Sequence, residues 1–413
     1  MALTLEQRMT HSQLLEHDLI SGESVTKILD LGQHAYADTF VKPTQLHMSE
    51  PVFPLEVYLN SNSGQVQVGY VSNAEDRYNL YGYSYTSSNS EFARTHWDEY
   101  AAQLREKYPA HNLVIEIGSN DGYLLNQFGG AGVQTLGIDS SKYMCDIATA
   151  QGMRCINAVF TGEVGTQVRK DIGHGADLII ANNVFNHAND PVDFACGVKE
   201  MLSESGVFVF ELPYWADTVD SGRFDQIYHE HISYFTVKSA WNLLAQAGLR
   251  IIDVDHVDYH GGSIRVTAQK GPTDSIPDHV QQLITKETQN GLFDPNTYVI
   301  MQHGMQARRD RWLQDFYKMR RFESSSIIGV GAAAKANTWL NWHRLDHTLI
   351  HCITDSSPHK QGKFTPLSRI PILGDEEFAK YENPYALILS WNIGASLKKA
   401  LLSINPTTRF ISQ

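Results

Sequence analysis

The hydrophobic and polar positions along the chain form three successive blocks. In residues 1–90, short alternating runs are separated by polar turns, which is typical of a small β-rich module. In residues 91–271, strand-like and helix-like runs follow one another, and this order predicts a parallel sheet with helical crossovers. The runs that carry the patterns are PVFPLEVYL and GQVQVGYV in the first block, and FARTHWDEYAAQLREKY, LVIEIG, VQTLGID, ADLIIANNV, FACGVKEML and GVFVFEL in the second.

The third block, residues 272–413, begins with a polar connector that favours helix and extends to about residue 320. The order of strand, glycine turn and helix then returns in SSIIGVG, AAAKANTWLNW, LIHCITD and YALILSW. We therefore expect an α/β protein of three units: a small β-rich module over 1–90, a Rossmann-like domain over 91–271, and a connector with a second Rossmann-like domain over 272–413.

The charge balance limits the possible partners. The 413 residues include 33 basic and 46 acidic side chains, so the formal net charge is -13. This disfavours a nucleic-acid backbone or an anionic membrane as the main partner, although a helix N-terminus or a single cation can still bind an anionic small molecule. No run reaches the roughly 18 apolar residues of a membrane span, and the first residues lack the features of a signal peptide. We expect a cytoplasmic protein that acts on a small molecule.

The four cysteines, Cys145, Cys155, Cys196 and Cys352, show no CxxC spacing. Neither a disulfide framework nor a thiolate metal site is visible in their arrangement. We expect them to be reduced and buried as small hydrophobic residues.

The segment LVIEIGSNDGYLLNQF places two glycines directly after a strand and at the start of a helix. Glycine lets the backbone turn tightly and lets a ligand approach without a Cβ in the way. The spacing E-x-G-x-x-x-G differs from the G-x-G-x-x-G of dinucleotide binders, and it favours S-adenosylmethionine, which has no pyrophosphate to hold. The candidate cofactor contacts here are Glu116, Gly118, Asn120 and Gly122.

Two further strand ends complete this candidate cofactor site. Asp139 ends the next strand, where a carboxylate can accept hydrogen bonds from ribose hydroxyls. Asn182, Asn183 and His187 follow the strand after that, at the edge where open α/β sheets bind ligands. The alternative is an ordinary corner between strand, glycine and helix in an enzyme that binds something else.

A second glycine turn supports a different hypothesis. Gly329, Gly331 and Ala334 form a G-x-G-x-x-A after a strand, and Asp355 ends a following strand. Lys335, just inside the helix, would suit a phosphate. This pattern is consistent with an NAD-dependent oxidoreductase that acts on a sugar nucleotide, and equally with a tight contact between helix and strand that binds no dinucleotide.

The stretch YHEHISYF, residues 228–235, gathers ionisable side chains between a strand-like and a helix-like run. A zinc protease helix would need H-E-x-x-H, but Ser233 stands at the place of the second histidine. In a strand, His229 and His231 would share one side and Glu230 would point away from both. No third ligand lies at metal-site spacing, so we expect no metal here. An acid and base function fits better, because a carboxylate or a phenol can fix the tautomer and the pKa of an imidazole.

Methyl transfer connects this cluster with the cofactor. A carbon nucleophile must first lose a proton, which is feasible beside a carbonyl group and with a positioned base. Histidine suits that task near neutral pH. A tyrosine or a second histidine can then stabilise the enolate oxygen.

The chain resembles the nucleotide-sugar C-methyltransferases, which make branched deoxysugars from 4-keto sugar nucleotides. The similarity extends from DLGQHAYADTF onward and includes EIGSNDGYLL, ANNVFNHANDPVDF, ELPY, FDQIYHEHISYF, HGGSIRV, GAAAKANTWLN, TDSSPHKQGK, IPIL and LILSWN. The resemblance implies a class I methyltransferase domain between the two other units. It also implies deprotonation next to the keto group, usually at C3, and then transfer of a methyl group from S-adenosylmethionine.

The resemblance also implies roles for particular residues. His231 would be the general base, with Tyr83, His187, Tyr228 and Glu230 as its supporting residues. The residues that would contact the substrate are His229, His260, Gly262, Ser263, Arg265, Lys335 and Asn337.

One departure from the family pattern concerns the N-terminal module. Members of this family normally carry a four-cysteine zinc site there, but this chain has Asn60 and Ser63 at one cysteine pair and no cysteine before Asp30. His11 and His17 without thiolates make no tetrahedral site, so we expect no structural zinc and a module that is stabilised by docking on its neighbour. Other activated-methylene substrates, and a binding protein without catalysis, stay open as alternatives.

Overall fold

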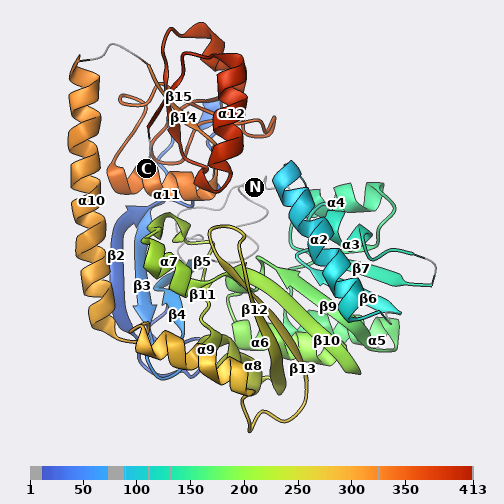
Figure 1. The fold of residues 1–413 in the computed structure, drawn as a ribbon. Coiled ribbons are helices and arrows are strands. Elements are labelled where there is room, and N and C mark those ends of the chain that lie inside the picture. Colours follow the sequence, from blue (N-terminus) through green and yellow to red (C-terminus); the bar gives the residue numbers. More distant parts are fainter. Residues whose placement is uncertain are drawn as a thin grey trace.

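Three large sheets and one strand pair organise the chain in the computed structural model (Figure 1). The structure describes residues 12–72, 88, 90–109, 112–130, 132–322 and 326–411. Within these residues, the sheets contain four, seven and five strands, and β1 (Ser12–Leu14) pairs separately with β5 (Tyr70–Ser72).

The four-stranded sheet combines the N-terminal residues with a strand from the middle of the chain. Its own strands are β2 (Thr26–His34), β3 (Phe53–Leu59) and β4 (Val66–Val68), all antiparallel. Its fourth strand is β11 (Ser233–Tyr234), which pairs with β4. The YHEHISYF segment therefore belongs in part to the N-terminal sheet.

The seven-stranded sheet has the order β12-β13-β10-β9-β6-β7-β8. Its strands from β6 to β10 run parallel, because helical crossovers connect them, and β13 is inserted antiparallel between β10 and β12. The chain reverses direction across the sheet between β6 and β9, which is the place where such sheets bind ligands. The strands are β6 (Leu113–Ile117), β7 (Gln134–Asp139), β8 (Cys155–Asn157), β9 (Ala176–Asn182), β10 (Leu202–Pro213), β12 (Leu249–Val257) and β13 (Ser263–Lys270).

Helices cover both faces of this sheet and bury a separate apolar core on each (Figure 1). Several begin where the sequence has a small polar residue: the side chains of Ser90, Ser141, Thr161 and Thr236 accept a hydrogen bond from the first helical turn. The helices are α2 (Glu91–Lys107), α3 (Tyr123–Asn126), α4 (Lys142–Ala150), α5 (Gly162–Ile172), α6 (Pro191–Met201), α7 (Trp215–Ser221) and α8 (Val237–Gln246).

The connector folds as α9 (Asp278–Gln289) and the long α10 (Pro295–Phe322), which runs beside β2 (Figure 1). The five-stranded parallel sheet that follows has the order β16-β15-β14-β17-β18, a doubly wound arrangement. Its elements are β14 (Ile327–Val330), α11 (Ala334–His343), β15 (Cys352–Thr354), β16 (Ile372–Leu373), β17 (Tyr385–Ile388), α12 (Gly394–Ile404) and β18 (Arg409–Ile411).

The N-terminal sheet is docked rather than free-standing. The amide of Asp30 donates to Gln302 Oε1 (3.1 Å), and Gln302 returns a bond to the Asp30 carbonyl (3.0 Å). Val41 exchanges two backbone hydrogen bonds, each of 2.8 Å, with Phe364 of the C-terminal unit. These contacts agree with the expectation that a module without zinc ligands depends on its neighbours.

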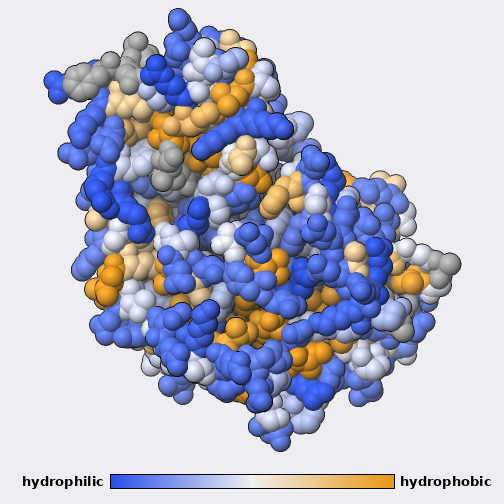
Figure 2. Space-filling view, in the orientation of Figure 1, coloured by the Kyte–Doolittle hydropathy of each residue, from blue (hydrophilic) through white to orange (hydrophobic). Residues whose placement is uncertain are grey.

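Polar and charged side chains predominate on the face shown in Figure 2, and apolar side chains appear there only in separate patches. Among the described residues, no helix combines the length and the apolar character needed to span a bilayer.

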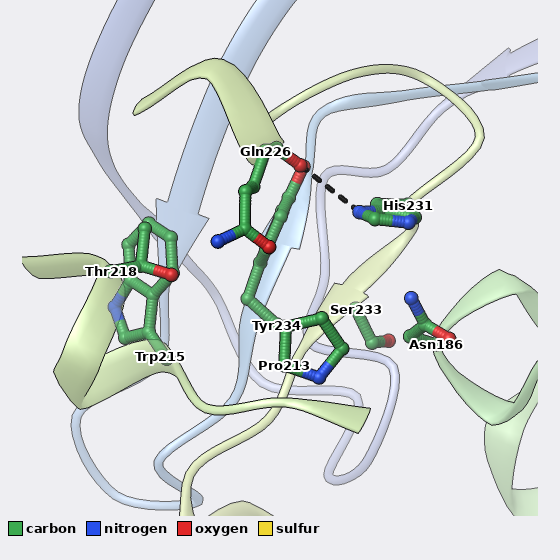
Figure 3. A pocket seen from close by; sticks show the side chains of 8 residues that line it. All are labelled: Asn186, Pro213, Trp215, Thr218, Gln226, His231, Ser233 and Tyr234. Atoms are coloured by element: carbon green, nitrogen blue, oxygen red, sulfur yellow. Dashed lines mark hydrogen bonds between the residues drawn. The ribbon is translucent and has the colours of Figure 1, made fainter. Parts of the chain in front are cut away.

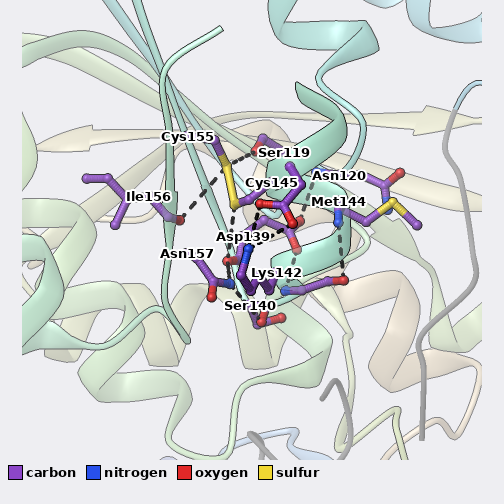
Figure 4. Close-up of a disulfide and its surroundings, with 12 residues drawn as sticks. Ser119, Asn120, Asp139, Ser140, Lys142, Met144, Cys145, Cys155, Ile156 and Asn157 are labelled. Atoms are coloured by element: carbon purple, nitrogen blue, oxygen red, sulfur yellow. Dashed lines mark hydrogen bonds and ion pairs between the residues drawn. A yellow bond between two sulfur atoms is a disulfide. The ribbon is translucent and has the colours of Figure 1, made fainter. Parts of the chain in front are cut away.

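The expectation of four reduced, buried cysteines is wrong at three positions. Cys145 on α4 and Cys155 on β8 form a disulfide, with their Cα atoms 5.5 Å apart (Figure 4). Cys196 is exposed, and Cys352 is buried as expected. Spacing along the sequence did not reveal the pair, because α4 and β8 become neighbours only when the sheet forms.

Glu287 joins the connector to the central unit. Its buried carboxylate accepts from the amides of Val237 (2.5 Å) and Lys238 (3.1 Å) at the start of α8, and from the Tyr214 hydroxyl (2.9 Å). It therefore satisfies amides that have no partner within their own helix.

We expect Glu287→Ala to lower the free energy of unfolding by about 2 kcal/mol, because it leaves buried donors without an acceptor. A urea titration followed by circular dichroism measures this loss. Glu106→Ala, on the exposed side of α2, is the matched control and should leave the midpoint unchanged. Equal midpoints for the two variants would contradict this role of Glu287.

Candidate active site

The glycine corner after β6 requires glycine at both predicted positions. Gly118 and Gly122 have φ angles of 73° and 78°, in the left-handed region that disfavours a side chain. A Cβ on Gly118 would also lie 2.9 Å from the Val184 side chain. Asn120, between them, is left-handed as well, with φ 50°.

Three acidic side chains gather at this corner. Asp139 Oδ2 accepts from the Asn120 amide and Oδ1 from the Ser141 amide, both at 2.8 Å (Figure 4). Burial raises the pKa of Asp139, and burial together with Asp121 raises the pKa of Glu116 well above its usual value. Such a cluster favours a positively charged ligand, because a cation would offset the repulsion between the carboxylates.

The predicted asparagines lie at the neighbouring strand end. Asn182 Oδ1 accepts from the Glu211 amide (3.0 Å), and the Asn183 amide donates to the Glu211 carbonyl (2.7 Å). Asn183 has a left-handed φ of 52°. The structure thus brings together all the residues that we predicted to bind the cofactor, at the ends of β6, β7 and β9.

His231 is buried, and both of its ring nitrogens are engaged. Nδ1 lies 3.0 Å from the Gln226 carbonyl (Figure 3). Nε2 lies 2.6 Å from the Tyr228 hydroxyl. A carbonyl only accepts, so Nδ1 carries the proton, and the lone pair on Nε2 accepts from Tyr228. Burial, together with the nearby Lys335, lowers the pKa of His231 to about 4. Nε2 is therefore available as a proton acceptor at neutral pH.

The other predicted supporting residues lie in different places. The His187 ring approaches the His231 ring edge-on, with 5.0 Å between centroids. Glu230 Oε1 accepts from the Asp38 amide (3.0 Å), so this carboxylate reaches back to the N-terminal residues. Tyr83 lies outside the described residues.

His229, a predicted substrate contact, is instead an anchor for the N-terminal sheet. Its Nε2 donates to the Pro54 carbonyl (3.0 Å), and only 1% of the residue is exposed. The rings of Tyr36, Phe53 and Tyr70 surround it at centroid distances of 5.9 to 6.4 Å. The structure gives this side chain a packing role.

The predicted substrate contacts on β13 also have partners within the protein. Arg265 donates two hydrogen bonds to Glu211 Oε2 (3.0 and 2.8 Å), and the buried hydroxyl of Ser263 donates to the Tyr259 carbonyl (3.0 Å). His96, which the sequence did not single out, donates to Glu211 Oε1 (2.6 Å) and stacks on Tyr259. Arg265 therefore neutralises a fully buried carboxylate.

Two cations from different units lie around an indole ring of the C-terminal unit: Arg223 comes from the central unit and Lys335 from the C-terminal unit. Lys335 Nζ lies 4.8 Å and the Arg223 guanidinium 3.6 Å from a ring centroid of Trp391, whose Nε1 donates to Asp225 Oδ2 (2.6 Å). Neither cation forms a hydrogen bond or ion pair with any residue that the structure describes. Burial lowers the pKa of Lys335 to about 8. Asn337, predicted beside Lys335, is buried and donates to the Ala37 carbonyl (2.5 Å).

Several residues of the site received no role in the sequence analysis, although they lie within or next to the motifs quoted there. Glu211 lies in ELPY, Trp391 in LILSWN, and Arg223, Asp225 and Gln226 directly precede Tyr228. Their position within or beside the quoted motifs was the available signal.

Family models match most of the chain. Residues 258–412 match a C-methyltransferase C-terminal domain, residues 90–254 a methyltransferase domain and residues 20–78 a putative zinc binding domain. The segment 20–78 contains no cysteine, and no cluster of three metal-binding side chains occurs within the described ranges.

C-methyltransferase NovU of Streptomyces niveus is 33% identical over 283 residues, which cover 68% of this chain and 67% of that protein. Among solved structures, an S-adenosylmethionine-dependent methyltransferase from Clostridium acetobutylicum shows 14% identity, covers 45% of this chain and 94% of its own, and has a TM-score of 0.35. Magnesium protoporphyrin IX methyltransferase from Synechocystis shows 14% identity, coverage of 43% and 83%, and a TM-score of 0.34. Structural similarity at this level assigns neither substrate nor mechanism.

The burial of His231 predicts how its ring titrates. A pKa near 4 lies below the ordinary value, so the ring should stay neutral, with the proton on Nδ1, from about pH 5.5 to 8. Nuclear magnetic resonance of the ¹⁵N-histidine protein measures this, with His231→Gln for assignment. A histidine peptide that titrates near pH 6.5 is the reference, and the same titration for His231 would contradict the buried environment.

Proposed function

The chain belongs to the C-methyltransferase family, and we propose that it methylates a ring carbon next to the keto group of a nucleotide-linked sugar. The matched methyltransferase domain and the strand order confirm the predicted class I methyltransferase fold, flanked by a β-rich module and a C-terminal Rossmann-like unit. The enzyme is an S-adenosylmethionine-dependent C-methyltransferase. This supports the methyltransferase prediction over the oxidoreductase alternative.

The glycine corner has the chemistry to hold S-adenosylmethionine. The acidic cluster of Glu116, Asp121 and Asp139 suits a ligand with an ammonium and a sulfonium group. Glu116 Oε2 is buried and has no hydrogen-bond partner in the described part of the chain. When bound, the cofactor supplies a methyl group that its sulfonium already activates for attack by a nucleophile.

We assign the general base to Nε2 of His231. In this proposal Nε2 removes a proton from the carbon beside the ketone, and the electron pair of the broken C–H bond moves toward the keto oxygen. The proton stays on Nδ1, which donates it in a hydrogen bond to the Gln226 carbonyl, and this keeps Nε2 as the reactive nitrogen. The Tyr228 hydroxyl, which donates to Nε2 without substrate, must turn away and can then donate to a substrate oxygen. His231 later releases the proton to solvent.

The paired cations around Trp391 support an anionic substrate. Lys335 and Arg223 lie beside the first turn of α11, at the carboxyl edge of a parallel sheet, where a diphosphate would meet cations and free helix amides. Lys335 is also within electrostatic range of His231, so this site is close to the base. We further propose that the methyl group is added at C3 of a 4-keto-6-deoxy sugar. The same proposal includes a small-molecule partner and action in the cytoplasm. A non-sugar substrate with an activated methylene is the second candidate.

The test uses 4-keto sugar nucleotides in deuterated water without cofactor. We expect the enzyme to exchange one ring hydrogen of its substrate for deuterium, as measured by mass spectrometry. His231→Gln should slow this exchange at least about a hundredfold and leave cofactor affinity unchanged, because a general base contributes about that much. His174→Gln, at an exposed site, is the control. Exchange that persists in His231→Gln would place the base elsewhere.

A second prediction concerns the cofactor site. Asp139→Asn should weaken S-adenosylmethionine binding about tenfold, because it removes a charged acceptor that also holds the Asn120 and Ser141 amides. Isothermal titration calorimetry measures the affinity, and Asp171→Asn on the exposed side of α5 is the matched control. Unchanged affinity would mean that the ribose lies away from Asp139.

A further inference from the structure

Gln226 forms one hydrogen bond through its backbone and another through its side chain, and the two bonds reach different segments of the site. It ends the single turn η4 (Phe224–Gln226), two residues before Tyr228. Its backbone carbonyl accepts from His231 Nδ1 (3.0 Å), and its side-chain Nε2 donates to the His260 carbonyl (3.2 Å). Figure 3 shows Gln226 beside His231 in a small cavity that Asn186, Ser233 and Tyr234 also line. One residue therefore links the base to a turn that lies 34 positions away in the sequence.

The turn that Gln226 holds is conformationally demanding. His260, Gly261 and Gly262 have successive left-handed φ angles of 53°, 88° and 113°. A left-handed histidine costs roughly 1 kcal/mol, so contacts from outside the turn are needed to keep it in place. Gln226 supplies one such contact at His260, and the Tyr214 amide supplies another at the Gly262 carbonyl (3.1 Å).

The conformation of this turn directs the His260 ring toward the other ionisable groups of the site. The ring contacts that of Tyr259 at a centroid distance of 4.1 Å, and its nitrogens make no hydrogen bond to a described residue. Burial, together with the nearby Lys335, His96 and His231, lowers the pKa of His260 well below its usual value. A neutral imidazole with an unused N–H is a suitable donor to an oxygen atom of a substrate.

The same turn η4 is also fixed to the C-terminal unit. Asp225, next to Gln226, accepts from Trp391 Nε1 (2.6 Å), and its side chain is buried. The Trp391 ring lies against Gly261 in turn. The base, the His260 turn and the paired cations are thus all connected through two consecutive residues, Asp225 and Gln226.

We propose that Gln226 is a positioning residue, whose side-chain amide sets the His260 ring relative to His231 so that the ring donates to an oxygen of the substrate. The backbone carbonyl of Gln226 fixes the tautomer of the base independently of the side chain. The role of the ring rests on the proposed function, because it needs the substrate to lie between the base and the His260 turn.

The first experiment compares deuterium exchange in the wild type, Gln226→Met, His260→Ala and the double variant. Methionine keeps the length of the side chain and the backbone carbonyl but removes the amide donor. We expect Gln226→Met to lower kcat/KM for exchange about tenfold and to leave cofactor affinity unchanged. If Gln226 acts through His260, adding Gln226→Met to His260→Ala should change the rate less than about twofold. Independent, multiplying effects, or no effect of Gln226→Met, would overturn the proposal.

Two controls separate positioning from folding. Gln289→Met, at an exposed site on α9, should match the wild type in every measurement. Gln226→Glu keeps the shape of the side chain but cannot donate from a carboxylate, so it should show the same loss as Gln226→Met. A wild-type rate in Gln226→Glu would count against the amide as the essential group.

A second measurement requires no substrate. In ¹⁵N-histidine spectra, Gln226→Met should shift the ring signals of His260 and preserve the Nδ1–H tautomer of His231. Unchanged His260 signals would refute the positioning role even if no sugar nucleotide proved to be a substrate. Conversely, a shift of His260 in an enzyme that exchanges no keto sugar would support the positioning and reject the proposed substrate.

Discussion

The candidate active site depends on the pairing of β11 with β4. Only Ser233 and Tyr234 take part in this pairing, yet it makes the segment after His231 an edge strand of the N-terminal sheet. The Ile232 carbonyl accepts from the Val68 amide (3.0 Å), and the buried His229 donates to Pro54 two residues before the base. Because both sides of His231 are held in this way, its backbone cannot shift without disturbing the N-terminal sheet. Fixing a base in this manner is what the removal of a weakly acidic proton requires.

The same segment helps to hold the N-terminal module against the rest of the protein. Its apolar side chains join one continuous core with residues of η4, α10 and the C-terminal sheet. An ion pair between Arg369 of the C-terminal unit and Glu50 of the N-terminal module (3.0 Å) adds to this packing. A sheet of this size buries too little area to be stable alone, so it depends on docking against the neighbouring units. Stability and placement of the base are therefore consequences of the same contacts.

Burial acts on the ionisable groups of the site in opposite directions. It raises the pKa of the carboxylates Glu116 and Asp139 at the glycine corner, and it lowers the pKa of His231 and Lys335. In each case burial disfavours the charged form: the neutral form of the acids at the glycine corner and the neutral form of the two bases become more stable. Arg265 and Glu211 differ from these groups, because they form an ion pair with each other within the protein. This contrast distinguishes the ligand-facing groups from the structural ones.

The sequence by itself determined the elements and the glycine corner. The alternation of strand-like and helix-like runs specified the parallel sheets, and the E-x-G-x-x-x-G spacing with Asp139 and Asn182 located the candidate cofactor site, because each of these signals acts within a few residues along the chain. The motif around His231 likewise located the candidate base. Only the tertiary structure decided that His229 packs against Pro54, that Glu230 reaches Asp38, and that Cys145 bonds Cys155. It also decided that Gln226 holds His260. The physical reason is that a side chain's role depends on its partners, and these partners lie in segments that become neighbours only when the sheets assemble.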